Sequence, residues 1–414
     1  MTESEFDKLL SKYADVVVRV GLNLRKGQRL LLRGILDDAP LMRKVTESAY
    51  KAGAIYVEPI YLDERITRIR FEHADPETLT EVPNWMLTRY EEYYERMDAE
   101  LAISSSDPEL LSGIDPELIA KHNKARAQKF EPLRKYENST NWCVVATATP
   151  AWAKKVFPNV PAKEAVEKLW EEIFASCRIH EADPVAAWTS HREKLQKYRD
   201  YLNAQKFSAL HYRAPNTDLT IGLPEKQKWQ GAQAEFKNGI IGVPNLPTEE
   251  VFTTPHTEKV NGFVSSTMPL NYGGVLIEDF SLTFENGRAV KVTAKKGEET
   301  LKKMIETDEN AARLGEVALV PNSSPISQRK ILFYNTLFDE NASCHVAIGN
   351  SYRDTIVGGE NMTEEEFAAA GGNKSLVHTD FMIGSDKLDI DGIKSDGSRV
   401  PVFRAGEWAV DIKN

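Results

Sequence analysis

LFDENASCHVAIG at residues 337–349, NSYRDT at 350–355 and NKSLVHTD at 373–380 form the stretch around which the chain is organised. The short apolar runs at 345–348 and 377–383 predict strands, and a histidine lies at or near the start of each. Imidazole and carboxylate groups beside apolar strands are a composition that divalent metals use. We therefore interpret the rest of the chain as a scaffold for this stretch.

The residues around this stretch predict a strand-rich C-terminal domain. FSALHYRAPNTDLTIGL, from residue 207, predicts a hairpin, and ENGRAVKVTAKKG predicts a second one with Asn286-Gly287 at its turn. A helix is expected at 298–305. Further strands are expected at residues 259–269, 274–284, 316–320 and 400–410. We predict an α+β domain over residues 206–414 with a mostly antiparallel sheet.

Strands alternate with helices in the first half of the chain. Strands are expected at residues 29–33, 54–60, 100–104 and 142–149. Helices separate them, an order that implies right-handed crossovers and a mostly parallel sheet. We predict an α/β domain over residues 1–205. No glycine-rich phosphate-binding motif follows these strands, so no nucleotide is assigned to this domain.

Composition and charge exclude several classes of protein. A chain of 414 residues is long enough for two domains, and a net charge of −10 argues against a nucleic-acid surface. No apolar run approaches the roughly 20 residues of a membrane span. The N-terminal segment predicts an amphipathic helix without a signal pattern, so we expect a cytoplasmic protein. The three cysteines lack CxxC spacing, which argues against a thiolate zinc site, and Cys344 is expected to pack in a core.

Two histidines are candidate metal ligands. His378 and Asp380 are two residues apart, and on a strand such residues share a face. They could bind one metal, or Asp380 could bridge two; the alternative is a hydrogen-bonded pair on a solvated face. His345 begins an apolar strand, where, taken alone, a structural histidine with satisfied hydrogen bonds is the better interpretation.

Two acidic segments add candidate ligands. Glu316 heads the apolar strand EVALV, and a buried carboxylate needs a partner. Glu249 and Glu250 precede VFTTP, where alternation predicts that one faces a site and the other faces solvent. Imidazoles and carboxylates without thiolates fit zinc, cobalt, manganese or iron. Two histidines with one carboxylate indicate iron oxygen chemistry, whereas excess carboxylates indicate two metals that share a water.

Four long motifs resemble one known family. NLPTEEVFTTP, GEVALVPNSSPI, FYNTLFDENASCHVAIG and NKSLVHTDFMIG are similar to the signature stretches of the thermophilic aminopeptidase family of metallopeptidases. They occur in the order of the family and span residues 245–384. The resemblance implies a cytoplasmic homodimer that acts on peptides with a free N-terminus and uses two divalent ions per chain, such as zinc, cobalt, magnesium or manganese. It implies as metal ligands Glu250, Glu316, Glu340, His345, His378 and Asp380.

The resemblance also implies a mechanism. The hypothesis is a metallo-aminopeptidase in which a metal-activated water attacks the first peptide bond. Glu316 would be a ligand or would move the proton, and the hydroxyl of Tyr352 would donate to the oxyanion. One alternative is an iron dioxygenase of the same fold that cleaves a dihydroxypyridine ring, with a triad of His345, His378 and Asp380. Another is a non-catalytic peptide- or metal-binding protein.

Overall fold

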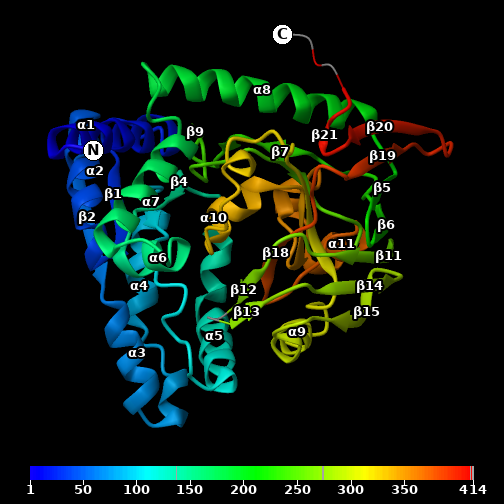
Figure 1. The fold of residues 1–414 in the computed structure, drawn as a ribbon, viewed down its shortest axis with the longest axis horizontal. Coiled ribbons are helices and arrows are strands. Elements are labelled where there is room, and N and C mark those ends of the chain that lie inside the picture. The colour runs from blue at the N-terminus through cyan, green and yellow to red at the C-terminus, as the bar shows by residue number, and fades with distance from the viewer. Residues whose placement is uncertain (137, 273–274, 411, 413–414) are drawn as a thin grey trace. The chain divides into compact units, whose positions relative to one another are not determined.

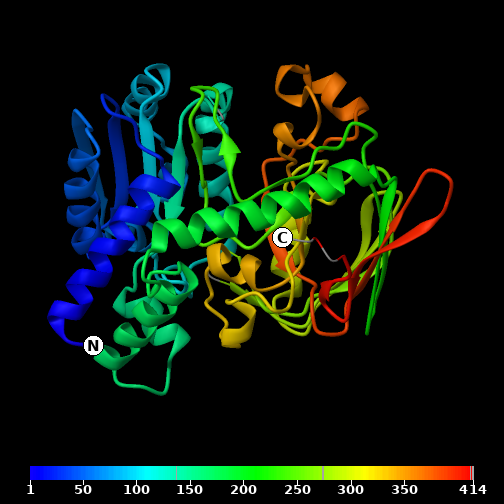
Figure 2. The same cartoon turned by 90° about the horizontal axis from the view of Figure 1, so that it is seen from above.

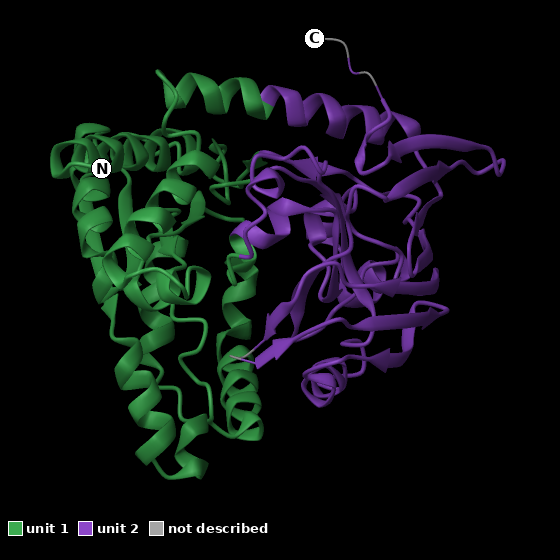
Figure 3. Ribbon diagram, in the orientation of Figure 1, with its two compact units in different colours: residues 1–192, 233–248, 333–337 green, residues 193–232, 249–332, 338–414 purple. Residues whose placement is uncertain are grey.

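The computed structural model describes residues 1–414 except 137, 273–274, 411 and 413–414, and its contacts divide the chain into two compact units (Figure 3). Unit 1 comprises residues 1–192, 233–248 and 333–337. Unit 2 comprises residues 193–232, 249–332 and 338–414. The first division falls inside helix α8, Pro184–Gln205, which Figure 2 shows as one continuous helix. A single domain border near residue 205 stays a prediction.

Unit 1 contains a parallel sheet, as the alternation of strands and helices predicts. Its strand order is β2-β1-β3-β4, and every pair in it is parallel. Residues 30–32 of β1 are fully buried, which is the pattern of a parallel strand covered on both faces. The blue and cyan parts of Figure 1 show these strands with their helices. The strands are β1 (Arg29–Ile35), β2 (Tyr56–Leu62), β3 (Ala99–Ile103) and β4 (Trp142–Val145).

The helices of unit 1 follow the predicted order. Asp115 caps α5: its side chain accepts a hydrogen bond from the backbone of Glu117, and Pro116 is the first helical residue. The helices are α1 (Glu3–Val16), α2 (Ala39–Lys51), α3 (Glu64–His73), α4 (Trp85–Glu95), α5 (Pro116–Phe130), α6 (Pro150–Val156) and α7 (Ala162–Ser176). The short strands β8 (Ala234–Glu235) and β9 (Ile241–Gly242) also belong to this unit.

Unit 2 is built mainly on two antiparallel sheets, so the predicted fold class is confirmed for both halves. The larger sheet has the order β15-β14-β11-β6-β5-β19-β20-β21. Its strands are β5 (Ala209–Ala214), β6 (Thr217–Gly222), β11 (Val260–Ser265), β14 (Ser281–Glu285), β15 (Arg288–Thr293), β19 (Asp389–Ile393), β20 (Arg399–Arg404) and β21 (Glu407–Trp408). Both predicted hairpins are present, and Asn286 and Gly287 have the positive φ values that a tight hairpin turn requires.

A smaller sheet of unit 2 has the order β18-β17-β16-β10-β7. Its strands are β7 (Gln230–Gly231), β10 (Val251–Thr253), β16 (Leu314–Leu319), β17 (His345–Gly349) and β18 (His378–Met382). Unit 2 also contains the pair β12 (Leu270–Tyr272) and β13 (Val275–Ile277) and the helices α9 (Glu298–Ile305) and α11 (Glu364–Ala369). Helix α10 (Thr336–Asp339) spans the last division between the units. The predicted stretch 274–284 thus splits into β13 and β14, and Gly274 itself lies outside the described residues.

The two faces of this smaller sheet carry different kinds of side chain. One face packs into the hydrophobic core of unit 2 through Val317, Leu319, Val346, Ile348 and Phe381. By alternation and register, the other face carries Glu316, Ala318, His345, Ala347 and Asp380. Glu316 pairs with Ala347, which pairs with Asp380 on the next strand. The sheet therefore gathers ionisable side chains from three neighbouring strands on one face.

Candidate metal centre

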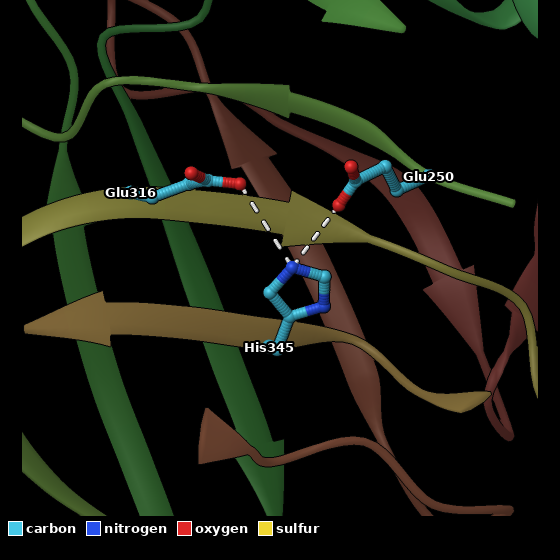
Figure 4. Close-up of side chains that lie close together, drawn as sticks. All are labelled: Glu250, Glu316 and His345. Carbon is cyan, nitrogen blue, oxygen red and sulfur yellow. Dashed lines mark ion pairs between the residues drawn. The ribbon is translucent and has the colours of Figure 1, made fainter. Parts of the chain in front are cut away.

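The first group of candidate ligands consists of Glu250, Glu316 and His345, all buried (Figure 4). Nε2 of His345 lies 3.1 Å from Oε2 of Glu250 and 3.8 Å from Oε1 of Glu316. Glu316 comes from the central strand β16, His345 from β17, and Glu250 directly precedes β10. Residues far apart in sequence thus point their polar atoms at one another from neighbouring strands.

The second group consists of Glu316, His378 and Asp380. Nε2 of His378 lies 3.4 Å from Oε2 of Glu316 and 3.6 Å from Oδ1 of Asp380. Asp380 is buried and His378 is half-buried, so the pair is not on a freely solvated face. Glu316 belongs to both groups and turns a different oxygen toward each histidine.

Both histidine rings are fixed through the nitrogen that faces away from the carboxylates. Nδ1 of His345 donates to the carbonyl oxygen of Ser343 at 3.1 Å, and Nδ1 of His378 donates to that of Asn350 at 2.7 Å. Because a carbonyl oxygen only accepts, each Nδ1 carries a proton. Such backbone contacts orient metal-binding histidines and leave Nε2 directed at the ion.

The carboxylates raise the pKa of both histidines. Burial by itself would lower the pKa of His345, but the adjacent Glu250 carboxylate, with the charges of Asp380 and Glu316, raises it to about 10. Burial likewise acts to lower the pKa of His378, and the charge of Asp380 and the contact with Glu316 outweigh it, raising this pKa to about 9. Without a metal, both rings are therefore cationic at neutral pH.

The same surroundings also raise the pKa of two buried carboxyl groups, which favours their neutral form. Burial raises the pKa of Glu316 to about 7; the contact with His378 opposes this shift, and the charges of Asp380 and Glu250 add to it. Burial raises the pKa of Glu340 well above its usual range, and the charges of Glu250 and Asp380 add to this shift. The ionised forms of these acids repel one another, and a cation between them would remove that repulsion.

The donors fit a divalent ion. Oε2 of Glu250 is buried, and although Nε2 of His345 is near, the two atoms lack hydrogen-bond geometry, so this oxygen has no hydrogen-bond partner among the described residues. Buried acceptors are normally paired, and a cation would satisfy this one. Imidazole nitrogens with carboxylate oxygens suit zinc, cobalt, manganese or iron. Cys344, as predicted, packs in the core instead, where its thiol donates to the carbonyl of Val320 at 3.3 Å.

Two predicted residues lie beside these groups. Glu340 is buried, and it belongs to neither group found among the described residues; the amide of Asn341 donates to its Oε1 at 3.4 Å. The ring of Tyr352 lies 4.8 Å from that of His378, between centroids, and 6.1 Å from that of Phe252. The turn after β17 therefore returns Tyr352 to the candidate site, as its position in the sequence predicts.

The expectation that one glutamate of the Glu249-Glu250 pair faces solvent is wrong. Glu249 and Glu250 are both buried. Strand alternation does not apply to them because β10 begins only at Val251. The backbone N–H of Glu249 instead donates to the side chain of Asn341 at 2.7 Å, which holds this segment beside the 3-10 helix Glu340–Ala342.

A family model for thermophilic metalloproteases (M29) matches residues 6–408. The chain belongs to this family. Aminopeptidase AmpS of Bacillus subtilis is 47% identical over 98% of this chain and 99% of its own length. The solved structure of wild-type AmpT from Thermus thermophilus matches 98% of this chain and all of its own with a TM-score of 0.91 at 44% identity. The predicted resemblance is confirmed, and the predicted class, a metallo-aminopeptidase, agrees with the M29 match and these names.

A more distant structure has the same overall fold. The 2,5-dihydroxypyridine dioxygenase of Pseudomonas putida KT2440 covers 99% of this chain with a TM-score of 0.51, but only 12% of the residues are identical. At this identity the likeness concerns the fold alone.

Among the described residues of this M29 chain, none of the helices has the length and apolar character needed to cross a membrane.

Proposed function

We propose that the chain is a metal-dependent aminopeptidase that removes the first residue of peptides through a metal-activated water at a two-metal site. The observation that carries this proposal is the position of Glu316, whose two oxygens face two separate groups of ligands. In the proposal, Glu250 and His345 would hold one ion, His378 and Asp380 would hold the other, and Glu316 would offer one oxygen to each group. Zinc, cobalt, magnesium or manganese are the candidate ions.

When bound, two such ions lower the pKa of a shared water and polarise the scissile carbonyl. The chain itself must then move a proton from the attacking water to the leaving amine. Glu316 is the candidate for this step as the alternative to its role as a ligand, because a carboxylate that holds two cations cannot also carry the proton. In the metal-free protein burial raises its pKa to about 7, near the operating pH. A carboxylate with an unshifted pKa would release the proton too readily to act as an acid.

Tyr352 is proposed to donate its hydroxyl to the oxyanion that develops on the carbonyl oxygen. Its ring contacts that of His378, and just over a third of its surface is exposed, so a substrate can reach it. The ring of Phe252 packs edge-on against the ring of Tyr352 and limits its motion. A donor held in place before the reaction costs little reorganisation in the transition state.

Recognition of the free amino group is proposed to fall to an acidic side chain or to a metal. Glu340 is one candidate because it lies close enough to Glu250 and Asp380 for their charges to shift its pKa. Its role as a direct metal ligand stays a second possibility within the same proposal. The homodimer and the cytoplasmic location that the resemblance implies stay predictions.

Turnover of an aminoacyl chromogenic amide tests the proposal. We expect hydrolysis that a chelator abolishes and a divalent ion restores, together with no hydrolysis of the N-acetylated amide. Metal analysis separates the two enzyme classes. About two ions of a metal other than iron per chain would support the aminopeptidase, whereas one iron would support the dioxygenase. Absence of turnover with every loaded metal would refute the aminopeptidase.

A further inference from the structure

Gly315 interrupts the regular pairing of β16 directly before Glu316. Leu314 pairs with Ile348, and Glu316 pairs with Ala347, so β16 has one extra residue at this point. Such a bulge changes the direction of the following side chain. Leu314 consequently points into the core of unit 2, whereas Glu316, two residues later, points to the opposite face with the candidate ligands.

The bulge also brings another backbone segment into very close approach. A Cβ atom placed on Gly315 would lie 2.2 Å from the carbonyl oxygen of Asn350 and 2.4 Å from that of Gly349. Real Cβ atoms essentially never come within 3.0 Å of a neighbour. The space taken up by these two carbonyl groups therefore exists only because residue 315 has no side chain.

One of these two oxygens orients a candidate ligand. The carbonyl oxygen of Asn350 accepts the hydrogen bond from Nδ1 of His378 at 2.7 Å. That bond fixes the ring so that Nε2 faces Glu316 and Asp380. The Cβ atom of any side chain on residue 315 would collide with the Asn350 carbonyl oxygen, which orients His378.

The segment that carries this oxygen cannot easily move away. The N–H of Asn350 donates to the carbonyl of Val377 at 2.7 Å, and that of Gly349 donates to the carbonyl of Arg313 at 2.7 Å. The amide of Asn373 donates to the carbonyl of Gly349 at 2.6 Å. Gly349 also has a φ of 103°, a conformation that other residues rarely adopt. The segment is thus held from both neighbouring strands.

We propose that Gly315 is a positioning residue for His378: its missing side chain leaves room for the Asn350 carbonyl that orients the imidazole. The inference rests on the proposed metal centre and assigns Gly315 to the group of Glu316, His378 and Asp380. Gly315→Ala should therefore weaken the site of His378 and Asp380 more than the site of Glu250 and His345, which shares only Glu316 with it.

Titration of the metal-free protein with cobalt(II) tests this role, followed by visible absorption and calorimetry. We expect two uptake steps in the wild type. In Gly315→Ala one step should weaken about 10–100-fold, the usual effect of a lost outer-shell contact, and its absorption bands should shift. The control is Gly392→Ala in β19, where a Cβ would lie 2.4 Å from the Phe207 ring. It should lower the melting temperature and leave both cobalt steps unchanged.

A second variant keeps the test decisive if Gly315→Ala does not fold. Asn373→Ala removes the hydrogen bond to the Gly349 carbonyl without adding an atom, and it should weaken the same cobalt step. Wild-type cobalt affinities and spectra in a folded variant of either kind would overturn the role of Gly315. A wild-type protein that takes up no cobalt would instead overturn the metal centre on which the inference rests.

Discussion

Nε2 of His345 and Oε2 of Glu250 are 3.1 Å apart in the interior of unit 2, in a geometry that does not make a hydrogen bond. In the proposed metal centre these two side chains are ligands, and an imidazolium that attracts a carboxylate without a hydrogen bond would be their metal-free form. A cation would replace the proton on the ring, because only the neutral imidazole binds a metal.

Metal binding should therefore release protons. The pKa of His345 is about 10 and that of His378 about 9, so both rings are protonated at a pH of about 8 and must lose their protons to bind ions. We expect release of about two protons per chain, and a metal affinity that falls as the pH is lowered. Calorimetric titrations in buffers of different ionisation enthalpy measure the number released.

His378→Ala serves as the control for this count, since it should release about one proton fewer when the remaining site is filled. Uptake of metal without any proton release would contradict the assignment of the two histidines as ligands.

His378→Ala and Asp380→Ala should each lower the metal content and abolish activity. Both residues belong to one of the two groups, so we expect loss of about one ion per chain while the ion of Glu250 and His345 is retained. Elemental analysis together with a rate measurement checks this. Asp396→Ala, in an exposed turn, is the matched control and should keep both. Full metal content with a near-normal rate in either site variant would make the assignment wrong.

Glu316→Gln should reduce kcat by at least about 100-fold, the lower range for loss of an acid–base group, and by more if an ion is lost as well. Because Glu249 is buried, it does not serve as a surface control. Glu285→Gln, on the exposed side of β14, takes that place and should leave the rate unchanged. Similar small effects of the two substitutions would remove Glu316 from the mechanism.

Tyr352→Phe should lower kcat by about 100-fold with little change in KM and no loss of metal, since the hydroxyl acts mainly on the developing oxyanion. Tyr212→Phe is the control, because the buried hydroxyl of Tyr212 has no hydrogen-bond partner among the described residues. It should leave kcat unchanged.

A purely structural role for Tyr352 makes a different prediction. Tyr352→Phe keeps the ring packed against Phe252 and His378 and removes only the hydroxyl. If that hydroxyl is structural, its loss should lower the melting temperature and leave kcat near the wild-type value. Measurement of kcat, metal content and melting temperature on one preparation separates the two roles.

Strands made of consecutive apolar residues could be predicted from the sequence. HVAIG follows a polar turn as an uninterrupted apolar run, and the structure has β17 at His345–Gly349. The strand β19 at Asp389–Ile393 was missed because DIDGI contains residues that are typical of turns. In the structure Asp391 pairs with Arg213 at 3.0 Å and with Arg404, so neighbouring strands compensate its charge.

The ligands could be named from their residue types, but their grouping could not. Glu316 lies between two histidines because β16 is central in its sheet and because the bulge at Gly315 sets its direction. Register and bulges depend on pairing between distant segments, which a pattern along one segment does not contain. The same limit explains why alternation failed for Glu249.

The division of the chain into its two units has a consequence for synthesis. Unit 1 includes residues 233–248 and 333–337, which lie within the sequence of unit 2. Domains generally fold as units, the N-terminal one first, while the chain emerges from the ribosome. Here the N-terminal unit lacks some of its parts until residue 337 has been translated, when most of the other unit has also been made. The first unit is therefore complete only after much of the second has been translated, and a stop codon near residue 205 would yield an incomplete first unit.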